Sequence, residues 1–414
     1  MLTLLLACTV PCGPGTHVEG GVCVPDAPSD SGVGDSGGDA DTDTDSDSDT
    51  DTDSDTDADT DTDTDTDTDT DTTPSWTVCS DGTGTYSTVQ AAVDGARDGD
   101  TITICAGTYD EEVDVNAVHL TLQGAGATST TLSSSSGTSL TITSATVSVS
   151  ALTLGGVAPE RSGGALTAKD ATVTLEDIGV NRCESASGVF AYAIESNDTT
   201  LSIDGADIED NEVGFVMNIE GGRGLTLRRA LITGNSASGR TSSSGGGILL
   251  AVSSSVEASN NLVYGNSYSY DDLFKLYEGS ESIWLWNNVI ADNDYTGSSS
   301  SGGAVHLEDG EEFENNIVSG NTGGGVLVDT ASSVTLQYND MSGNTGYDLK
   351  ASSGTVSGTG DLTSDPKFTS SGTGDYSLSG FSPCIDAGDP VAGYNDGDGT
   401  RNDMGAFGGP YGGW

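Results

Sequence analysis

Short segments in which apolar and polar residues alternate recur along the chain from residue 172 onward. Six of them are TVTLED, TLSIDG, GLTLRR, SVEASN, SIWLWN and SVTLQY, which begin at residues 172, 200, 224, 255, 282 and 333. A period of two residues is typical of a β-strand with one buried face. The residues predicted to point inward are Val173 and Leu175, Leu201 and Ile203, Leu225 and Leu227, Val256 and Ala258, Ile283 and Leu285, and Val334 and Leu336.

Five of these six segments are followed by an asparagine that lies three residues after a valine, isoleucine or methionine. NNLVYGN, NNVIADN and NNIVSGN show this motif most clearly, and it recurs every 23 to 31 residues. A repeat of this length predicts a solenoid. A further strand precedes each alternating segment, as in GGILLAV and GAVHLED. Two or three short strands per repeat, joined by Gly/Ser corners, indicate a parallel β-helix.

The recurring asparagines have a structural interpretation. Equivalent corners of successive coils in such a solenoid lie about 4.8 Å apart. An asparagine there tolerates a left-handed backbone, and its amide can hydrogen-bond to the next asparagine along the stack. We therefore expect a ladder formed by Asn211, Asn235, Asn266, Asn293, Asn321 and Asn344. Cys183 occupies the same position one coil earlier, so we expect a small buried side chain there.

The same pattern bounds the predicted β-helix at residues 74–350. Residues 86–113 predict a short amphipathic helix, a turn and the first strands, and this helix would cover the open edge of the first coil. Residues 351–414 hold little periodic pattern, and we expect them to form an irregular cap. Glu311 interrupts the alternation, so the strand that contains it either begins later or shifts its register.

The composition agrees with a narrow core. The 414 residues include 59 glycines and only 6% aromatic residues, which suits stacked layers of small side chains. The formal net charge is −53. A surface of this charge repels nucleic acids and anionic lipids, so we expect no nucleic-acid partner.

Much of this charge lies in residues 35–73, where aspartate occupies every odd position from 39 to 71. The segment has almost no apolar residues and its like charges repel, so we predict a disordered, extended acidic tether. Weak Ca²⁺ binding by this run is an alternative interpretation, although the glycine turns of a defined calcium loop are missing.

The first residues, MLTLLLACTV, contain an apolar run that ends in Leu-Leu-Ala-Cys8. This run resembles a bacterial lipobox, and residues 1–8 correspond to part of a signal peptide without its basic start. The resemblance implies lipid on Cys8, attachment to a membrane through this anchor only, and an extracytoplasmic location at the outer membrane or cell surface. The alternative is that Cys8 is an ordinary thiol.

Seven cysteines agree with an export compartment. Cys12 and Cys23 bracket a Gly-rich loop within the small segment 9–34, which one disulfide could close. Cys79 and Cys105 lie on two successive strand-like segments, which a second disulfide could join. Cys183 and Cys384 are left without a predicted partner.

Two terminal motifs resemble a known family. DGTGTYSTVQAAVDGARDGDTITICAGTYDEEV (81–113) resembles the opening of pectin-lyase-like β-helix proteins, and SPCIDAGDPVAGYNDGDGTRNDMGAFGGPYGGW (382–414) is similar to the end of choice-of-anchor Q domain surface proteins. The resemblance implies an all-β, single-stranded right-handed parallel β-helix over about 74–414. The family includes pectate lyases, polygalacturonases, pectinesterases, epimerases and adhesins. The GQA and DFIFG motifs of pectinesterases and the NTD and RIK motifs of polygalacturonases do not occur in this sequence.

The alternation also predicts which side chains face outward. Trp284 and Trp286 should lie side by side on one strand, about 6.6–6.8 Å apart, with Glu257 and Glu312 beside them. Exposed indoles stack on sugar rings and carboxylates accept hydrogen bonds from sugar hydroxyls, so these four residues are the predicted ligand-binding site. The alternative is that the insertion SYSYDDLFKLYEGS (267–280) folds over the indoles and buries them.

Three further groups of polar residues carry hypotheses. In a pectate-lyase-like mechanism Arg228 would be the base, with carboxylates such as Asp204 holding Ca²⁺; the alternative is a plain ion pair between Arg228 and Asp204. His306 is expected to be a surface residue near Lys275. A Gly-rich loop near the C-terminus offers oxygen ligands for a structural Ca²⁺, or forms an Asx-turn cap. The predicted ligands in that loop are Asp389, Asn395, Asp396, Asp398 and Asp403.

We therefore expect a monomeric surface lipoprotein whose β-helix binds polysaccharide or cell-envelope glycan without catalysing a reaction. One alternative is a Ca²⁺-dependent polysaccharide lyase or epimerase, in which Ca²⁺ is the cofactor. The other is a structural or adhesive surface protein without a sugar ligand.

Overall fold

The computed structural model forms two compact units, Met1–Asp69 and Thr70–Trp414. It describes the backbone of residues 16–19 and 22–25, and then residues 76–155, 164–184, 191–221, 223–238, 246–269, 271–276, 282–297, 302–308, 310–330 and 334–413. In the first unit β1 (Thr16–Glu19) pairs antiparallel with β2 (Val22–Pro25). The predicted acidic tether, Cys8, Cys12 and the side chain of Cys23 lie outside the described residues.

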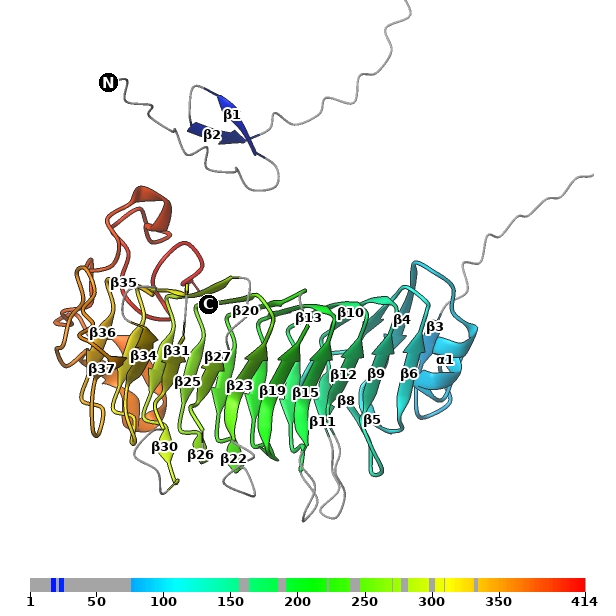
Figure 1. Ribbon diagram of the computed structural model, residues 1–414. Coiled ribbons are helices and arrows are strands. Elements are labelled where there is room, and N and C mark those ends of the chain that lie inside the picture. The colour runs from blue at the N-terminus through cyan, green and yellow to red at the C-terminus, as the bar shows by residue number, and fades with distance from the viewer. Residues whose placement is uncertain are drawn as a thin grey trace, which may run out of the picture. The chain divides into compact units, whose positions relative to one another are not determined.

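The second unit is a parallel β-helix with three long sheets, whose coils follow one another from α1 to the C-terminal residues (Figure 1). Sheet 1 contains β3 (Trp76–Val78), β4 (Asp100–Ile104), β7 (Leu120–Gln123), β10 (Thr146–Ser150), β13 (Thr172–Glu176), β16 (Thr200–Asp204), β20 (Leu225–Arg228), β24 (Val256–Ser259), β28 (Ile283–Trp286), β32 (Glu312–Glu314) and β35 (Thr335–Gln337).

The other two long sheets close the coil. Sheet 2 contains β5 (Gly107–Asp110), β8 (Thr130–Ser133), β11 (Thr153–Gly155), β14 (Gly179–Asn181), β17 (Asp207–Glu209), β21 (Leu231–Thr233), β25 (Leu262–Tyr264), β29 (Val289–Ala291), β33 (Ile317–Ser319) and β36 (Asp340–Ser342). Sheet 3 contains β6 (Val113–Asn116), β9 (Leu140–Thr143), β12 (Leu166–Lys169), β15 (Tyr192–Asn197), β19 (Phe215–Glu220), β23 (Gly247–Val252), β27 (Phe274–Leu276), β31 (Val305–Leu307), β34 (Val326–Thr330) and β37 (Leu349–Ser353).

Short elements complete the domain. A small fourth sheet contains β18 (Glu212–Val213), β22 (Ser236–Ser238), β26 (Ser267–Ser269) and β30 (Asp294–Tyr295). β38 (Phe368–Ser370) and β39 (Asp375–Leu378) pair antiparallel, and two 3₁₀ turns span η1 (Ser371–Thr373) and η2 (Ala392–Tyr394). In the described part of the chain, no helix has the length and apolar character to cross a membrane.

The core forms as the alternation predicts. The predicted inward side chains of sheet 1 are buried, except that Val334 is partly buried just before β35. Glu311 does not lie in the strand, because β32 begins at Glu312 and Phe313 is the inward residue. The strand therefore begins later than the pattern suggested, and the register of the neighbouring strands continues without a shift.

The first coil is closed as expected. The helix α1 (Val89–Gly95) begins after Thr88, whose hydroxyl accepts a hydrogen bond from the Ala91 N–H. Its buried residues are apolar and face the first strands, so the helix covers what would be an open sheet edge. Cys79 and Cys105 form a disulfide between the first two coils.

Two ladders of asparagines follow the corners. Along the predicted ladder each Nδ2 donates to the Oδ1 of the next asparagine, as in Asn266 to Asn293 at 2.9 Å. The ladder begins at the backbone N–H of Cys183, which donates to Asn211 Oδ1. A second ladder, which the sequence analysis missed, lies at the corner between sheets 1 and 2 and contains Asn261, Asn288, Asn316 and Asn339.

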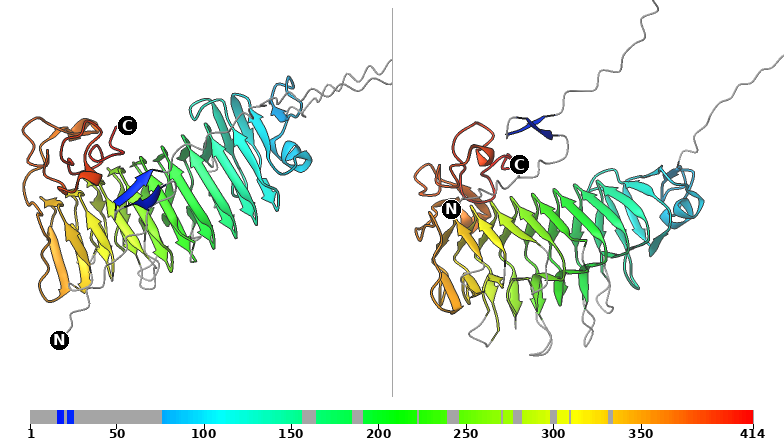
Figure 2. Two further views of the ribbon diagram at one scale, coloured as in Figure 1. Left: turned by 90° about the horizontal axis from the view of Figure 1, so that it is seen from above. Right: turned by 45° about the horizontal axis from the view of Figure 1, so that its top comes forward.

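Residues 382–413, called here the C-terminal segment, do more than close the last coil. They lie beside the coils drawn in yellow (Figures 1 and 2) and pack onto the outer face of sheet 2. Met404 and Ala406 contact an apolar cluster that includes Leu262, Val289 and Ile317. Three asparagines in the left-handed conformation, Asn260, Asn287 and Asn315, hydrogen-bond to this segment.

Candidate functional site

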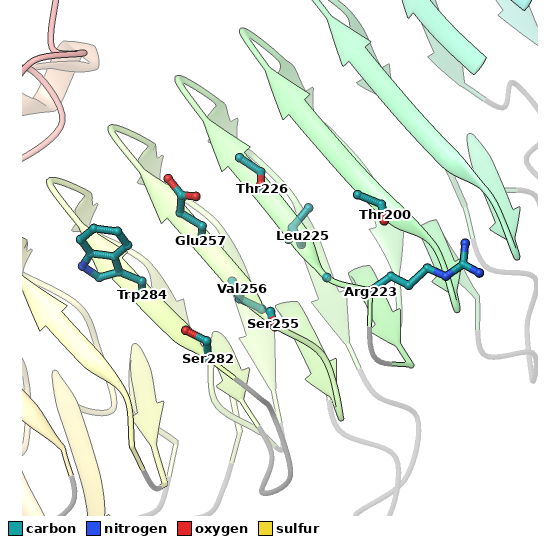
Figure 3. A pocket seen from close by; sticks show the side chains of 10 residues that line it. Thr200, Arg223, Leu225, Thr226, Ser255, Val256, Glu257, Ser282 and Trp284 are labelled. Atoms are coloured by element: carbon teal, nitrogen blue, oxygen red, sulfur yellow. The ribbon is translucent and has the colours of Figure 1, made fainter. Parts of the chain in front are cut away.

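The outer face of sheet 1 carries the most distinctive polar and aromatic side chains. In the register of the sheet, Thr226 pairs with Glu257, Glu257 with Trp284, and Trp284 with Glu312. A groove of about 220 Å³ lies along these strands. Figure 3 shows Thr226, Glu257 and Trp284 along its length. The groove is lined by Thr200, Arg223, Gly224, Leu225, Thr226, Ser255, Val256, Glu257, Ser282 and Trp284.

The two tryptophans are side by side but differ in exposure. Their ring centroids are 5.8 Å apart and the planes are inclined by 30°. Trp284 is half-buried and lines the groove. Trp286 is only 4% exposed, because Tyr394 and Tyr411 of the C-terminal segment contact its ring edge-on. The expectation of two exposed indoles is therefore wrong for Trp286.

The insertion 267–280 is not what covers Trp286. Its described residues form β26 in the fourth sheet and β27 in sheet 3, and they do not cross sheet 1. The rings that cover Trp286 belong to residues more than 100 positions later in the chain. The pattern of alternation could not show this contact, because it describes only the strand itself.

Two charged residues beside the groove, Arg228 and Glu257, are paired with each other. Arg228 forms an ion pair with Glu257, and its guanidinium lies 5.1 Å from the ring centroid of Tyr411. The expected pair between Arg228 and Asp204 is not formed, because Arg229 Nε lies 2.6 Å from Asp204 Oδ1 instead. A catalytic base needs a free site for its proton, so this geometry does not favour Arg228 in that role.

The carboxyl groups of Glu314 and Asp389 meet where the C-terminal segment crosses sheet 1. Glu312 is exposed beside Trp284, whereas Glu314 is buried beside Trp286. Burial, a hydrogen bond to Asp389 and the negative charges of Asp389 and Glu312 raise the pKa of Glu314 to about 8. A protonated Glu314 shares its proton with Asp389 and so joins the sheet to the C-terminal segment.

The five predicted calcium ligands near the C-terminus mostly hold their own loop. Asp396 accepts hydrogen bonds from the N–H groups of Asp403 and Gly409, and Asp398 accepts them from Thr400. Asp389 accepts one from the Val391 N–H, Asn395 donates to the Gly399 carbonyl, and Asp403 accepts one from the Asp386 N–H. These are the contacts of an Asx-turn cap, and a Ca²⁺ ion in this loop stays a prediction.

A compact group of possible metal ligands lies elsewhere, on sheet 3. Among the described residues, one ligand atom each from His306, Glu308 and Asp329 lie within 4.8 Å of one another. His306 Nδ1 is 2.8 Å from Asp272 Oδ2, and Nε2 is 3.2 Å from Asp329 Oδ1. Although burial lowers the pKa of His306, the bonds and charges of Asp272 and Asp329 raise it to about 9. The expectation of an ordinary surface histidine is wrong.

The outer face of sheet 2 carries a second groove, of about 360 Å³, in the earlier coils. Its lining includes Thr131, Thr153, Asn181, Asp207 and Glu209 and contains no aromatic side chain. Burial raises the pKa of Asp207. Without an apolar platform this groove offers hydrogen bonds but little contact area for a sugar ring.

Cys183 and Cys384 are both buried. Cys183 is covered within the first asparagine ladder. The Cys384 thiol donates to Asp340 Oδ2 at 3.2 Å, and burial with this neighbouring carboxylate raises its pKa. Neither thiol has the exposure of a nucleophile, and the pKa of Cys384 is raised rather than lowered.

Comparison with known proteins adds family information. The family model for pectinesterase matches residues 75–158, and the model for the right handed beta helix region matches residues 246–371. The search of curated proteins gives no match.

The similar solved structures are distant in sequence. A pectate lyase, Pel9A, is 13% identical over 77% of this chain and 90% of its own, with a TM-score of 0.42. The pectin methylesterase from carrot is 16% identical over 54% of this chain and 83% of its own, with a TM-score of 0.31. The A-module of the Azotobacter vinelandii mannuronan C-5 epimerase AlgE6 is 16% identical over 64% and 67%, with a TM-score of 0.27.

The two family-model matches agree with the parallel solenoid. The pectinesterase model covers the first coils and the right handed beta helix model covers the later ones, with residues 159–245 between them. The described chain from Trp76 onward is a right-handed parallel β-helix followed by the C-terminal segment, and parts of it match the family models for pectinesterase and for the right handed beta helix region.

Proposed function

We propose that the β-helix binds a neutral polysaccharide along the outer face of sheet 1, with Trp284 as the platform for a sugar ring. The observation that carries this proposal is the placement of a half-buried indole at the end of an open groove. Stacking on Trp286, which Tyr394 and Tyr411 cover, supports Trp284 in one orientation. A preorganised platform loses less conformational entropy when a ligand binds.

The size of the groove favours a polymer. Pockets that enclose a drug-sized ligand measure roughly 300–1,000 Å³, and this groove is smaller and open. It therefore supports contact with a short stretch of a long chain, while the hydroxyl groups of Thr226, Ser255 and Ser282 and the exposed Glu312 offer hydrogen bonds.

The charges favour a neutral ligand and binding without catalysis. The net charge of −53 repels polyuronates over long distances. Glu257 is engaged by Arg228, which in turn lies beside Tyr411, so neither side chain is a free acid or base. A lyase or epimerase would need such a group at the reacting carbon.

The test uses the full chain with a panel of neutral polysaccharides and polyuronates, with and without Ca²⁺. Co-sedimentation reports binding, and absorbance of unsaturated products reports lyase activity in the same samples. Replacing Trp284 by alanine should weaken binding about tenfold or more, because stacking and apolar contact are lost. Phe381→Ala is the control for general hydrophobic adsorption, since Phe381 is 86% exposed away from the groove.

Each outcome distinguishes the candidate functions. Unchanged retention of Trp284→Ala would contradict the proposed platform. A Ca²⁺-dependent product that disappears in Arg228→Ala would make the protein a lyase. No retention on any polysaccharide of the panel would favour a structural or adhesive role.

We also propose that the protein is a lipoprotein displayed outside the cytoplasm, with residues 35–73 as an acidic linker between a lipid on Cys8 and the β-helix. The resemblance of the first residues to a lipobox supports this proposal. Expression in a Gram-negative host with a clickable fatty acid should label the wild type, and Cys8→Ala should lose the label and leave the membrane fraction. Equal labelling of both proteins would contradict it.

A further inference from the structure

A group of polar side chains on sheet 3 lies away from the proposed polysaccharide groove. It draws on three successive coils: Asp272 just before β27, His306 in β31 with Glu308 after it, and Asp329 in β34. In the sheet register Lys275 of β27 pairs with His306, and His306 pairs with Leu327 of β34. Side chains far apart in sequence are thus brought to one point by the stacking of the coils.

Asp272 determines how the imidazole is oriented. Its side chain is only 6% exposed, and its two oxygens accept the Gly303 N–H at 2.5 Å and face His306 Nδ1 at 2.8 Å. A carboxylate held in this way keeps the proton on Nδ1 and turns Nε2 toward the other side of the ring. This is the arrangement in which a histidine is presented to a metal ion, with the carboxylate behind it.

Nε2 is buried and lies close to two carboxylates. It is 3.2 Å from Asp329 Oδ1, which also accepts a hydrogen bond from the Ser352 hydroxyl. Ligand atoms of His306, Glu308 and Asp329 lie within 4.8 Å of one another. In a tetrahedral zinc site, ligands about 2.0–2.2 Å from the metal are about 3.3–3.6 Å apart, so small side-chain movements would close this set around one ion.

The donor set favours a transition metal over Ca²⁺. Ca²⁺ takes six to eight oxygen ligands, whereas one imidazole nitrogen with two carboxylates suits Zn²⁺ and similar ions. The local charge also favours a cation, because four carboxylates lie around the imidazole and Lys275. They belong to Asp271, Asp272, Glu308 and Asp329.

We propose that His306, Glu308 and Asp329 bind one divalent transition-metal ion, with Zn²⁺ the best match, and that Asp272 is the positioning residue for His306. Three protein ligands leave a fourth position for water. The ion would join the coils of β31 and β34 on sheet 3, while Asp272 links them to the coil of β27. The competing arrangement is a proton on Nε2, which would leave an ion-pair network of Asp272, His306 and Asp329 without a metal.

The experiment titrates Zn²⁺ into the full chain after treatment with EDTA and follows heat release and the melting temperature. Wild type should bind one ion tightly and melt at a higher temperature with the metal. His306→Gln and Asp329→Asn should each weaken this binding at least about 100-fold, since each removes a direct ligand. Asp272→Asn should weaken it by about 10–100-fold, as expected for a residue behind the metal ligand.

The control is His119→Gln, because His119 is a histidine of the first coils that accepts a hydrogen bond from the Thr146 N–H. The Zn²⁺ titration of His119→Gln should match that of wild type. Co²⁺ in place of Zn²⁺ should give the visible absorption of a site with a nitrogen ligand, absent in His306→Gln; the oxygen ligands of the aspartate run are present in both proteins.

Identical Zn²⁺ titrations of wild type and His306→Gln would overturn the proposal. A second result would also overturn it: the melting temperature of wild type does not respond to Zn²⁺, and His306→Gln melts at a lower temperature than wild type. That result would identify the ion-pair network without a metal. If His306→Gln does not fold, Asp329→Asn with Co²⁺ gives the same decision.

Discussion

The early and late coils of the β-helix share one backbone geometry but fill the corner between sheets 1 and 2 differently. In the early coils the corner holds buried apolar residues, namely Leu152, Ile178, Ala206 and Ala230. In the late coils the equivalent position holds Asn261, Asn288, Asn316 and Asn339, which bond to one another. The corner therefore accepts either an apolar side chain or a fully hydrogen-bonded amide. The boundary between the two kinds of corner lies where the Ala230 N–H donates to Asn261.

The residue that precedes the corner position also differs between the early and the late coils. It has a left-handed backbone in both, as at Asp177 and Asn287. Asp177 is exposed, whereas Asn260, Asn287 and Asn315 bind the C-terminal segment. The candidate groove extends from Thr200 to Trp284, across the boundary between open and covered coils. The outer surface repeats from coil to coil. The stretch at the groove differs from the rest because the C-terminal segment covers the coils on one side of it.

The largest effect is expected from breaking the corner ladder. Asn288→Ala removes the acceptor for the Asn261 N–H and amide and leaves the Ala258 carbonyl without its donor. Two or three buried groups without partners should lower the free energy of unfolding by roughly 3–5 kcal/mol. Urea denaturation measures the change, and Asn181→Ala, on the outer face of sheet 2, is the control with an expected change below about 0.5 kcal/mol.

The reverse substitution, which places an asparagine at an apolar corner, tests the same difference between early and late coils. Ala206→Asn places an amide at a corner whose neighbours, Ile178 and Ala230, have no side-chain amide that could continue a ladder. It should also destabilise the protein, although by less if the Ile178 N–H donates to it as the Ala230 N–H donates to Asn261. Wild-type stability of Asn288→Ala would show that the ladder is not what distinguishes the late coils.

A smaller effect is expected from releasing the C-terminal segment. Asn287 donates to Asn402, Asp403 and Gly405 and accepts a bond from the Asn402 amide. Asn287→Gly keeps the left-handed turn but removes these bonds, so the loss should be about 2 kcal/mol and residues 402–409 should exchange their amide hydrogens faster. Asp177→Gly is the matched control at an uncovered corner. Unchanged exchange in Asn287→Gly would contradict the role assigned to this asparagine.

A pH-dependent effect is expected at the contact between sheet 1 and the C-terminal segment. The pKa of Glu314 is raised from 4.5 to about 8, so the folded protein holds the proton over this range and the unfolded chain does not. The contribution of Glu314 is therefore present in full below about pH 4.5 and is lost as the pH rises to about 8.

Urea midpoints measured between pH 5 and pH 8 test this linkage. Glu314→Gln should flatten the decline that wild type shows, while Glu209→Gln, on sheet 2, should keep the wild-type profile. The raised pKa of Asp403, about 6, acts in the same direction in all three proteins and cancels in the comparison. A wild-type decline that persists in Glu314→Gln would assign the pH dependence to other groups.

The sequence by itself determined the strands, the repeat and most of the inward side chains. These features follow from local physics: a period of two residues buries one face, and stacked corners bring equivalent residues together. The ladder from Asn211 to Asn344 could be predicted for this reason, and so could the helix that covers the first coil. The columns of sheet 1 that contain Glu257, Trp284 and Glu312 also follow from the alternation.

Only the tertiary structure decided what covers the outward face and which charged groups meet. Trp286 is buried by rings more than 100 residues later, Asn287 bonds to residues up to 118 positions away, and Arg228 pairs with Glu257 rather than Asp204. The grouping of Asp272, His306 and Asp329 depends on loop lengths that differ from coil to coil. Alternation reports only whether a side chain points outward, and contacts beyond the surface of the coil depend on a segment that has no period of its own.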